Sequence, residues 1–452
     1  MFHPSRSRNK ALTPHRRRPG VRSTLGLLVV GATAAATTLA PLDTALAKKD
    51  SAVPHVAYQQ WGSASAFGAG AFAGTEAASG SLRLSNPTGT FTYADPFGDG
   101  SSTAYDVGTW TSPVVTPGFA YTELVSSWNA DTPAGTWVQV SVHGKADDGS
   151  TSKEYVLGRW AEDTDAIHRT SVPAQGDTLA TVAIDTLIAR KGRTLTDWQL
   201  TVSLYRKHGT TATPSVSLVG AMASAVPAVK KVPASPLGGA EGTDLAVPPL
   251  SQEIHRGEYP QYNGGGEAWC SPTSTAMILD YWDARFPTAG YGPSDQDLAG
   301  IPYADPQVDY AAANTYDWNY DGTGNWPFNT AYAGRYGLEA FVTRLRSLTE
   351  AEKFIAAGIP LVVSVSFKES ELTGSGYSTN GHLMVIRGFT AQGDVIANDP
   401  ASHLDPSNAS VRTVYNRAEF ENVWIPKSGG IAYVIHPASV PLPSNVSPEH
   451  NW

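Results

Sequence analysis

Residues 50–225 consist of short stretches with apolar and polar side chains in alternation, which limits the fold to extended, sheet-forming structure. In "TWVQVSVHGK" the side chains of Val138, Val140 and Val142 fall on one face of an extended chain, and polar side chains fall on the other. Further short strands are expected in "YTELVSSW", "EYVLGRW", "DWQLTVSLYRK" and "SVSLVGAM", and turn-forming clusters such as "ADDGS" separate them. The pattern predicts an all-β sandwich or jelly-roll domain over residues 50–225.

The pattern changes after this region. Residues 226–247, "VPAVKKVPASPLGGAEGTDLAV", are rich in Pro, Ala and Gly and have no periodicity, which indicates a linker. A second domain is expected over residues 248–440, and residues 441–452 are expected to form a C-terminal tail. No disulfide can form in a chain with one cysteine, so both domains must be stable through their hydrophobic cores.

The second domain combines helical and extended patterns. Helical spacing of apolar residues appears in "SPTSTAMILDYWDARF". The stretch "SLTEAEKFIAAG" begins with a capping box, either Ser347 with Glu350 or Thr349 with Glu352, and Gly358 is expected to end this helix. Strands follow in "IPLVVSVSF" and in "GHLMVIRGFTAQGDVIANDP", where "AQGD" forms the turn between two strands. A helix followed by a sheet that packs upon it predicts an α+β domain.

The N-terminus predicts secretion. Seven basic residues precede position 23, an apolar stretch of small residues covers 24–40, and Ala45–Ala47 reads Ala-Leu-Ala. This order is typical of a secretory signal peptide, so we expect residues 1–47 to be removed, through Sec or twin-arginine export. The alternative is an anchor helix, but the stretch is diluted by Gly and Thr and is short of the ~20 strongly apolar residues of a membrane span. We therefore expect an extracellular protein, with association with the cell wall as an open alternative.

The charge of the chain bears on its partners. The formal net charge is −9, and it becomes −15 without residues 1–47, which carry seven basic residues and one acidic residue. An acidic surface is unsuited to the phosphate backbone of nucleic acids. We expect no nucleic-acid partner and, after signal cleavage, no membrane span.

Cys270 is the only cysteine of the chain and stands between "GGGEAW" and a predicted helix. Pro272 suits the first turn of that helix, so the thiol is expected at the helix N-terminus. There the helix dipole and unpaired N–H groups stabilise a thiolate over a thiol, and the same N–H groups can hold an oxyanion. The alternative is an inert thiol in the core.

A nucleophilic cysteine needs an imidazole that takes its proton and an acceptor that orients the imidazole. His382 opens an apolar strand, and Asp399 ends the next strand. A symmetric turn around residues 392–393 leaves Asp399 a few residues short of facing His382. Asn398 and His403 are therefore alternative orienting residues.

The blocks "WCSPTSTAMILDYW", "GHLMVIRGF" and "VIANDPAS" resemble, in the same order, the Cys, His and Asp blocks of the C39-like cysteine peptidases, which have a papain-like fold. The resemblance covers roughly residues 247–437. It implies that Cys270 is the nucleophile, His382 the general base and Asp399 the residue that orients the base.

The resemblance has two further implications. The family uses a glutamine upstream of the cysteine as an oxyanion-hole donor, and Gln252 in "VPPLSQ" is the better match, with Gln261 as the alternative. The family usually has Gly directly after the cysteine, whereas this chain has Ser271. We interpret this difference as a change in the detail of the oxyanion loop rather than a loss of activity.

The sequence and the resemblance together predict a secreted cysteine peptidase. It would hydrolyse peptide or related amide bonds through an acyl-enzyme, act on a peptide or protein substrate, and need no cofactor or metal. The competing hypothesis is a cell-surface or carbohydrate-binding protein with an inactive papain-like domain. In that case the N-terminal domain would bind cell-wall material or polysaccharide. Its tryptophans are expected to be mostly core or strand-edge residues, and one or two exposed ones could stack on sugars; they are Trp110, Trp128, Trp137, Trp160 and Trp198.

Residues 317–325, "DWNYDGTGN", have polar side chains at the offsets of a calcium loop. Position twelve is Phe328 rather than a bidentate glutamate, so a polar turn is favoured over a calcium site. The aromatic side chains of this region offer a broad apolar wall for a cleft; they are Trp318, Tyr320, Trp326 and Phe328.

Overall fold

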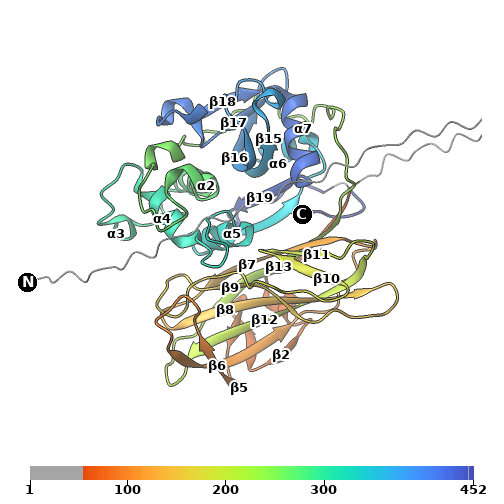
Figure 1. Ribbon diagram of the computed structural model, residues 1–452, viewed down its shortest axis with the longest axis vertical. Helices are drawn as coiled ribbons and strands as arrows, with labels where there is room; N and C mark the ends of the chain where they lie inside the picture. The colour runs from red at the N-terminus through yellow and green to blue at the C-terminus, as the bar shows by residue number, and fades with distance from the viewer. Residues whose placement is uncertain (1–53, 446) are drawn as a thin grey trace, which may run out of the picture. The chain divides into compact units, whose positions relative to one another are not determined.

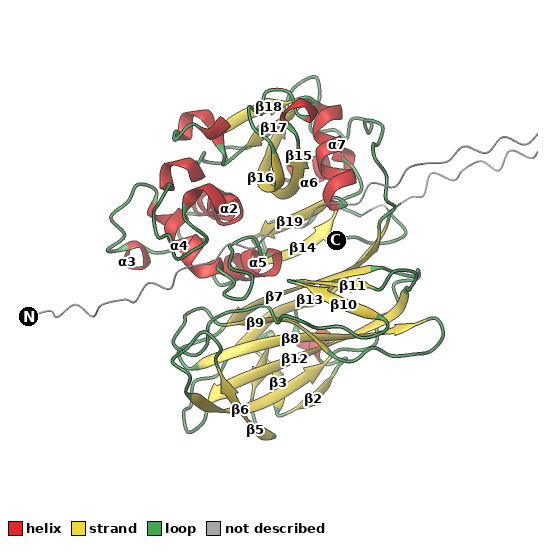
Figure 2. Ribbon diagram, in the orientation of Figure 1, coloured by secondary structure: helices red, strands yellow, loops and turns green. Residues whose placement is uncertain are grey.

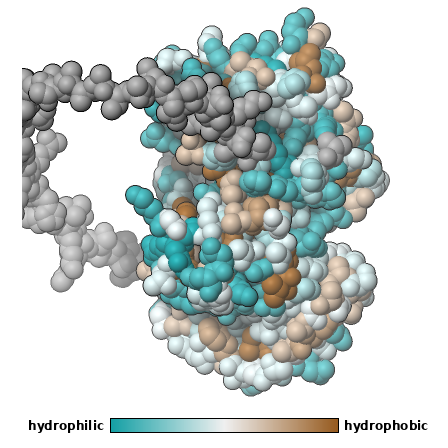
Figure 3. Space-filling view, turned by 90° about the vertical axis from the view of Figure 1, so that its right-hand side faces the viewer, coloured by the Kyte–Doolittle hydropathy of each residue, from teal (hydrophilic) through white to brown (hydrophobic). Residues whose placement is uncertain are grey.

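The computed structural model describes residues 54–445 and 447–452, and residues 51–452 form one compact unit (Figure 1). The signal peptide expected over residues 1–47 lies outside the described residues. In the described part, no helix has the length and apolar content that crossing a membrane requires. On the face drawn in Figure 3, hydrophobic residues lie in small patches scattered among hydrophilic ones.

Two antiparallel sheets make up the first part of the chain, so the predicted β character of this region is confirmed (Figure 2). The first sheet has the order β10-β11-β7-β13-β4-β3, with β1 paired to β13, and the second has the order β2-β6-β12-β8-β9, with β5 paired to β6. The first sheet contains β1 (His55–Trp61), β3 (Thr75–Ala78), β4 (Ser81–Leu84), β7 (Glu123–Asp131), β10 (Ala180–Ala183), β11 (Thr186–Ala189) and β13 (Ser215–Ala225). The second contains β2 (Ala71–Ala73), β5 (Gly89–Ala94), β6 (Ser102–Thr111), β8 (Thr136–Ala146), β9 (Tyr155–Trp160) and β12 (Leu195–Lys207), and one short helix is present, α1 (Ala64–Phe67).

The second part has helices around a third antiparallel sheet of order β14-β19-β15-β16-β17-β18. Its strands are β14 (Glu339–Arg344), β15 (Leu361–Phe367), β16 (Thr379–Phe389), β17 (Val395–Asn398), β18 (Arg412–Tyr415) and β19 (Ile431–His436). Its α-helices are α2 (Cys270–Arg285), α3 (Asp295–Leu298), α4 (Pro306–Thr315), α5 (Trp326–Gly334), α6 (Leu348–Ala356) and α7 (Arg417–Ser428). The short 3-10 helices are η1 (Gln252–His255), η2 (Gly266–Ala268), η3 (Glu369–Glu371), η4 (Ser402–Leu404) and η5 (Asn408–Ser410).

The ends of helix α6 follow the sequence prediction in part. Ser347 is the N-cap, and its hydroxyl accepts a hydrogen bond from the Glu350 N–H at 3.4 Å, as the first of the two capping alternatives requires. The Glu350 carboxylate does not complete the box, because it accepts from the N–H of Arg346 at 2.8 Å instead. Gly358 has φ of 78° directly after the helix, a conformation that glycine adopts without strain.

The two parts of the chain share one hydrophobic core, because a single cluster of buried apolar side chains includes residues of both. Helix α5 and strand β14 pack on strand β7 (Figure 1). The ring of Phe328 in α5 lies 6.0 Å from Trp128 and 5.5 Å from Trp160, centroid to centroid. The side-chain amide of Asn129 donates to the carbonyl of Ala340 at 2.9 Å and accepts from its N–H at 3.1 Å.

The predicted linker, residues 226–247, is held by hydrogen bonds to the second part. The Val232 N–H donates to Asn422 at 2.9 Å, and the Ser235 N–H donates to Glu421 at 2.7 Å. Its chain therefore follows a fixed path, while the domain boundaries drawn at its ends remain predictions.

Two hairpins of the first part have two-residue turns that begin with a non-glycine residue at positive φ. Ser79 has φ of 52° in the β3–β4 hairpin, and Ile184 has φ of 57° in the β10–β11 hairpin. Gly or Asn usually occupies this position, because the left-handed conformation costs other residues about 1–2 kcal/mol. A β-branched side chain is least suited to it, so Ile184 is strained.

Candidate active site

The thiol of Cys270 lies at the N-terminus of α2, as the sequence predicts. Cys270 is partly exposed and lines a cavity of about 920 Å³. The same cavity is lined by His382 and Gln252. The first N–H groups of a helix have no partner within the helix. In α2, Pro272 has no N–H and the Thr273 N–H donates to the Trp269 carbonyl at 3.0 Å, so the N–H groups of Cys270 and Ser271 are the donors beside the thiol.

His382 and Asp399 form a buried ion pair. The Nε2 atom of His382 lies 2.8 Å from Oδ1 of Asp399, and His382 is 4% exposed while Asp399 is 0% exposed. The β16–β17 pairing shifts its register between Ile386 and Gly388. This irregularity, together with the reach of the two side chains, closes the gap that a symmetric turn would leave.

Asp399 is further held by three donors. The hydroxyl of Tyr377 lies 2.8 Å and 3.0 Å from its two oxygens, and the hydroxyl of Tyr415 donates at 2.7 Å. The N–H of Ala401 donates to Oδ1 at 3.0 Å. These donors stabilise the carboxylate form, and the sequence contains no signal that identifies the two tyrosines as its partners.

The electrostatics of the site favour a protonated imidazole. Burial lowers the pKa of His382, but the charge and hydrogen bond of Asp399 and the interaction with Cys270 outweigh it, so this pKa is raised to about 10. Burial raises the pKa of Asp399, whereas the His382 charge and the hydrogen bonds to it lower that pKa by more. Because Nε2 faces Asp399, Nδ1 is the ring nitrogen available to the thiol.

The alternative orienting residues lie elsewhere. Asn398 donates to the carbonyls of Val247 and Pro248 at 3.2 Å and 3.1 Å, away from the imidazole of His382. The ring of His403 bonds the Ser375 carbonyl and the Thr413 hydroxyl, each at 2.9 Å. Neither residue is placed to orient His382.

Of the two glutamine candidates, Gln252 lines the cavity beside Cys270, and Gln261 is exposed outside its lining. The Nε2 group of Gln252 donates to the carbonyl of Glu267 at 2.9 Å and to the Glu253 carboxylate at 3.2 Å. Both N–H bonds are therefore engaged. To donate to an oxyanion, the amide would have to release one of these acceptors.

Ser271, the residue that departs from the family pattern, points into the protein. It is fully buried, and its hydroxyl lies 2.9 Å from the hydroxyl of Tyr433 in β19. The serine thus joins the start of α2 to the central sheet, and its role in this structure is packing rather than contact with the cavity.

The turn at residues 317–325 is held by its own hydrogen bonds. Asp317 accepts from the N–H groups of Ser171, Asn319 and Tyr320 and from the Asn325 amide at 2.9–3.2 Å. These donors satisfy the carboxylate without a cation and favour the polar-turn interpretation.

The predicted aromatic wall is correct for two of its four members, because Tyr320 and Trp326 line the cavity. Trp318 packs instead on His168, with ring centroids 4.3 Å apart, and Phe328 packs on tryptophans of the first part.

The five tryptophans of the first part that are expected to be mostly core or strand-edge residues are all buried. They are Trp110, Trp128, Trp137, Trp160 and Trp198. The interpretation of one or two of them as exposed carbohydrate contacts is wrong, because their rings form the core of the sheets.

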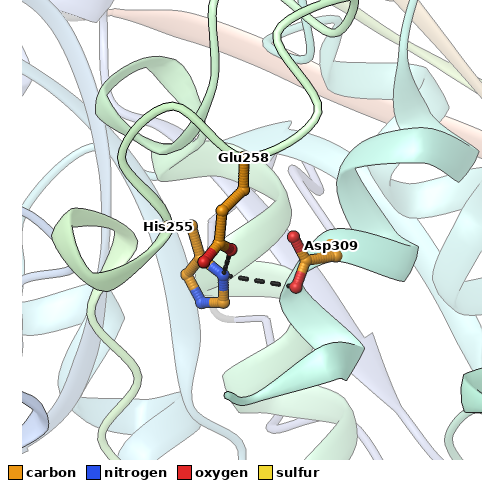
Figure 4. Close-up of side chains that lie close together, drawn as sticks. All are labelled: His255, Glu258 and Asp309. Atoms are coloured by element: carbon orange, nitrogen blue, oxygen red, sulfur yellow. Dashed lines mark hydrogen bonds and ion pairs between the residues drawn. The ribbon is translucent and has the colours of Figure 1, made fainter. Parts of the chain in front are cut away.

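A second polar cluster joins η1 to α4 (Figure 4). The Nδ1 atom of His255 lies 2.8 Å from Glu258 and 3.3 Å from Asp309. The three side chains offer potential metal-ligand atoms within 4.8 Å of one another. Nε2 of His255 is buried and has no hydrogen-bond partner among residues 54–445 and 447–452, whereas a metal-bound histidine normally donates from its second nitrogen. We therefore interpret the cluster as an ion pair that fixes η1, which carries Gln252.

The first part of the chain also lines the cavity, which the sequence does not predict. Ile184, Asp185 and Thr186, at the tip of the β10–β11 hairpin, are lining residues together with Cys270. Pairing of distant segments determines this proximity, and residues 184 and 270 are too far apart in the sequence for a local pattern to reveal it.

A thiol at a helix N-terminus and a buried imidazole–carboxylate pair in one cavity are the groups with which cysteine-type hydrolases work. Comparison with known families gives a more specific assignment. Residues 57–224 match the model of the Peptidase C39 N-terminal domain, and residues 244–431 match that of the Peptidase C39-like family. The second part of the chain belongs to the C39-like peptidases, which supports a cysteine-type peptidase.

Solved structures add little to this assignment. A C39-like peptidase from Bacillus anthracis is 21% identical, with 43% of this chain and 97% of that chain covered and a TM-score of 0.25. A LamA variant from Z. galactanivorans in complex with laminaritriose and laminaritetraose is 11% identical, with 33% and 81% covered and a TM-score of 0.16. These scores are too low to bear on fold or function. No curated protein matches the chain.

Proposed function

We propose that the protein is a secreted cysteine peptidase that hydrolyses peptide or related amide bonds through Cys270, His382 and Asp399. The observation that carries the proposal is that His382, which lines the cavity together with Cys270, is paired with the buried carboxylate of Asp399. Family membership supports the class of reaction. Secretion rests on the sequence of residues 1–47 and is tested by locating the mature protein in the culture medium.

The proposed reaction has two halves. The Cys270 thiolate attacks the carbonyl carbon of the peptide bond, the developing oxyanion lies near the first N–H groups of α2, and the imidazolium of His382 donates its proton to the leaving amine. The C–N bond breaks and a thioester acyl-enzyme remains. Water then adds to the thioester, His382 takes the proton of that water, and the carboxylic acid leaves as the C–S bond breaks.

Asp399 serves this cycle by orienting the ring. Its bond to Nε2 leaves Nδ1 facing the thiol, and its charge stabilises the imidazolium. The raised pKa of His382 implies that the imidazolium persists well above neutral pH.

Alkylation of Cys270 by iodoacetamide, followed by intact mass from pH 5 to 10, tests the proposal. An ordinary thiol, with a pKa near ~8.5, loses about 80-fold in labelling rate between pH 8 and pH 6. We expect Cys270 to lose far less, because the imidazolium sustains the thiolate, and His382→Ala to restore the ordinary profile. An ordinary profile for the unmodified protein, unchanged by His382→Ala, would falsify the activated-thiol mechanism.

Turnover is tested by digestion of a peptide library with the mature protein and with Cys270→Ala as control. We expect cleavage that disappears in the variant. Equal cleavage by both proteins would assign the activity to another group or to a contaminant.

A further inference from the structure

The tip of the β10–β11 hairpin brings an apolar side chain of the first part of the chain to the cavity of the candidate active site. Ile184 is 37% exposed and lines the cavity together with Cys270 and His382. It is absent from the hydrophobic core clusters, whereas Val182, in the same hairpin, packs against the core. Ile184 therefore keeps an exposed apolar surface at the cavity wall.

The backbone at this position disfavours isoleucine. Ile184 is the first residue of a two-residue turn and has φ of 57°, where glycine or asparagine is expected. A β-branched residue in this region is a genuine outlier, and strained residues of this kind gather at binding and catalytic sites. Its strain and its exposure thus coincide at the wall of the cavity.

The hairpin tip is fixed to the second part of the chain. The carboxylate of Asp185 accepts a hydrogen bond from the N–H of Trp326 at 2.9 Å, and Trp326 is the first residue of α5. The same carboxylate accepts from the Thr186 hydroxyl at 2.9 Å. A carboxylate at a helix N-terminus is favoured by the helix dipole, so the wall is rigid.

Two aromatic side chains extend the apolar surface beside Ile184. Tyr320 is 43% exposed, Trp326 is partly buried, and both line the cavity.

Charged side chains of the cavity wall are largely neutralised by one another. Arg344 pairs with Glu123, and Arg256 pairs with Glu253 at 2.6 Å. The exposed apolar surface, rather than a net charge, therefore distinguishes this wall.

We propose that Ile184, Tyr320 and Trp326 form a subsite that binds an apolar side chain of the peptide substrate near the bond that is cleaved. The first part of the chain thereby takes part in selecting the substrate. This proposal rests on the proposed function, since it assigns a preference to the same cavity.

The subsite is tested in the full-length protein with Ile184→Gly, which removes the side chain and relieves the backbone. Ser79→Gly is the matched control, because Ser79 also begins a two-residue turn at positive φ in the first part, and it does not line the cavity. The readout is the rate at which peptidyl chloromethyl ketones with Leu or Asp next to the reactive carbon alkylate Cys270, with iodoacetamide as the small reagent. This readout needs no turnover.

We expect the unmodified protein to react faster with the Leu reagent, and Ile184→Gly to lower this Leu/Asp ratio at least fivefold while the iodoacetamide rate is unchanged. Ser79→Gly should keep the ratio. A Leu/Asp ratio that Ile184→Gly leaves intact, with Cys270 still reactive, overturns the subsite alone. A Cys270 that reacts with iodoacetamide only as an ordinary thiol, and with neither peptidyl reagent, overturns the proposed function and the subsite with it.

Discussion

At the scale of single residues, the candidate site depends on how Asp399 is supported. Four groups contact its carboxylate: the imidazole of His382, two tyrosine hydroxyls and one backbone N–H. A carboxylate buried this completely is stable as an anion only with such donors. Its charge then holds His382 in the protonated, oriented form.

Substitutions of Asp399 distinguish the effect of its negative charge on turnover from the effect of its hydrogen bond to His382. Asp399→Asn is expected to keep the fold and lower kcat by up to about 10⁴-fold, because the amide disturbs the tautomer and cannot stabilise the imidazolium. Asp399→Ala should lose more, since nothing then holds the ring. Asn398→Ala should leave turnover nearly unchanged and lower thermal stability, because Asn398 bonds the carbonyls of Val247 and Pro248. Turnover measurements, with folding checked by circular dichroism, show for the three variants whether Asp399 or Asn398 orients His382. A folded, fully active Asp399→Ala would show that another residue orients His382.

Ser271 and Tyr433 form a pair whose loss should affect stability rather than chemistry. Ser271→Gly leaves the buried Tyr433 hydroxyl without its partner and is expected to cost about 1–3 kcal/mol of unfolding free energy. Tyr433→Phe in the same chain should recover part of this cost. Urea unfolding of the single and double variants measures the coupling, and turnover should stay near that of the unmodified protein. Strictly additive losses, or a large change in turnover, would contradict this assignment.

At the scale of the secondary-structure elements, local patterns in the sequence predict the strands, helices and turns well. The alternating stretches around Val140 and Leu200 are strands β8 and β12, and helix α2 begins at Cys270, which the sequence predicts to lie at a helix N-terminus. Strands β16 and β17 flank the predicted turn. Local backbone preferences and the spacing of apolar residues determine such strands, helices and turns, so they can be predicted from a single sequence.

Features that depend on contacts between residues far apart in the sequence cannot be predicted in this way. The pairing of His382 with Asp399 follows from a register irregularity, and the support of Asp399 by Tyr377 and Tyr415 follows from packing. The burial of all five tryptophans, rather than of most of them, could not be predicted, because alternation shows which face of a strand is apolar but not what covers it. Ile184 at the cavity depends on two segments that meet only in the folded chain.

The attachment of the β10–β11 hairpin should depend on pH through Asp185. Burial raises the pKa of this carboxyl to about 6, so between pH 4 and 6 the folded chain binds its proton more tightly than the unfolded chain. Its ionisation therefore lowers the free energy of unfolding as the pH rises through this range, by at most about 3 kcal/mol. Asp185→Asn keeps an acceptor for the Trp326 N–H and removes the charge. Its stability relative to the unmodified protein should rise from pH 4 to pH 7 and then stay constant.

Urea unfolding at pH 4, 5, 6 and 7 measures this difference, with Asp165→Asn, a substitution at an exposed site, as control. A difference between Asp185→Asn and the unmodified protein that does not vary with pH would show that the carboxyl titrates equally in the folded and unfolded chains.

At the scale of the whole molecule, the two parts are joined by shared packing. Phe328 inserts between Trp128 and Trp160, and Asn129 satisfies both backbone groups of Ala340. Groups that are buried only in the joined state make each part depend on the other. The first part thus belongs to the same folded unit as the second.

The shared core predicts a single cooperative unfolding transition of the mature chain. Phe328→Ala should lower the free energy of unfolding by about 3–5 kcal/mol and shift two probes together, tryptophan fluorescence and the accessibility of Cys270. Tyr303→Ala, at an exposed ring, is the control. Separate transitions, of which Phe328→Ala moves only the one seen at Cys270, would show that the parts fold independently.

The contact of Phe328 with Trp128 and Trp160 also has a consequence for biogenesis. A chain made from its N-terminus exposes the two indoles for as long as synthesis takes to reach Phe328, roughly ten to thirty seconds at typical elongation rates. During that time the newly made segment exposes a hydrophobic surface that favours aggregation. Until Phe328 has been made, the two indoles therefore lack a ring that covers them in the folded chain.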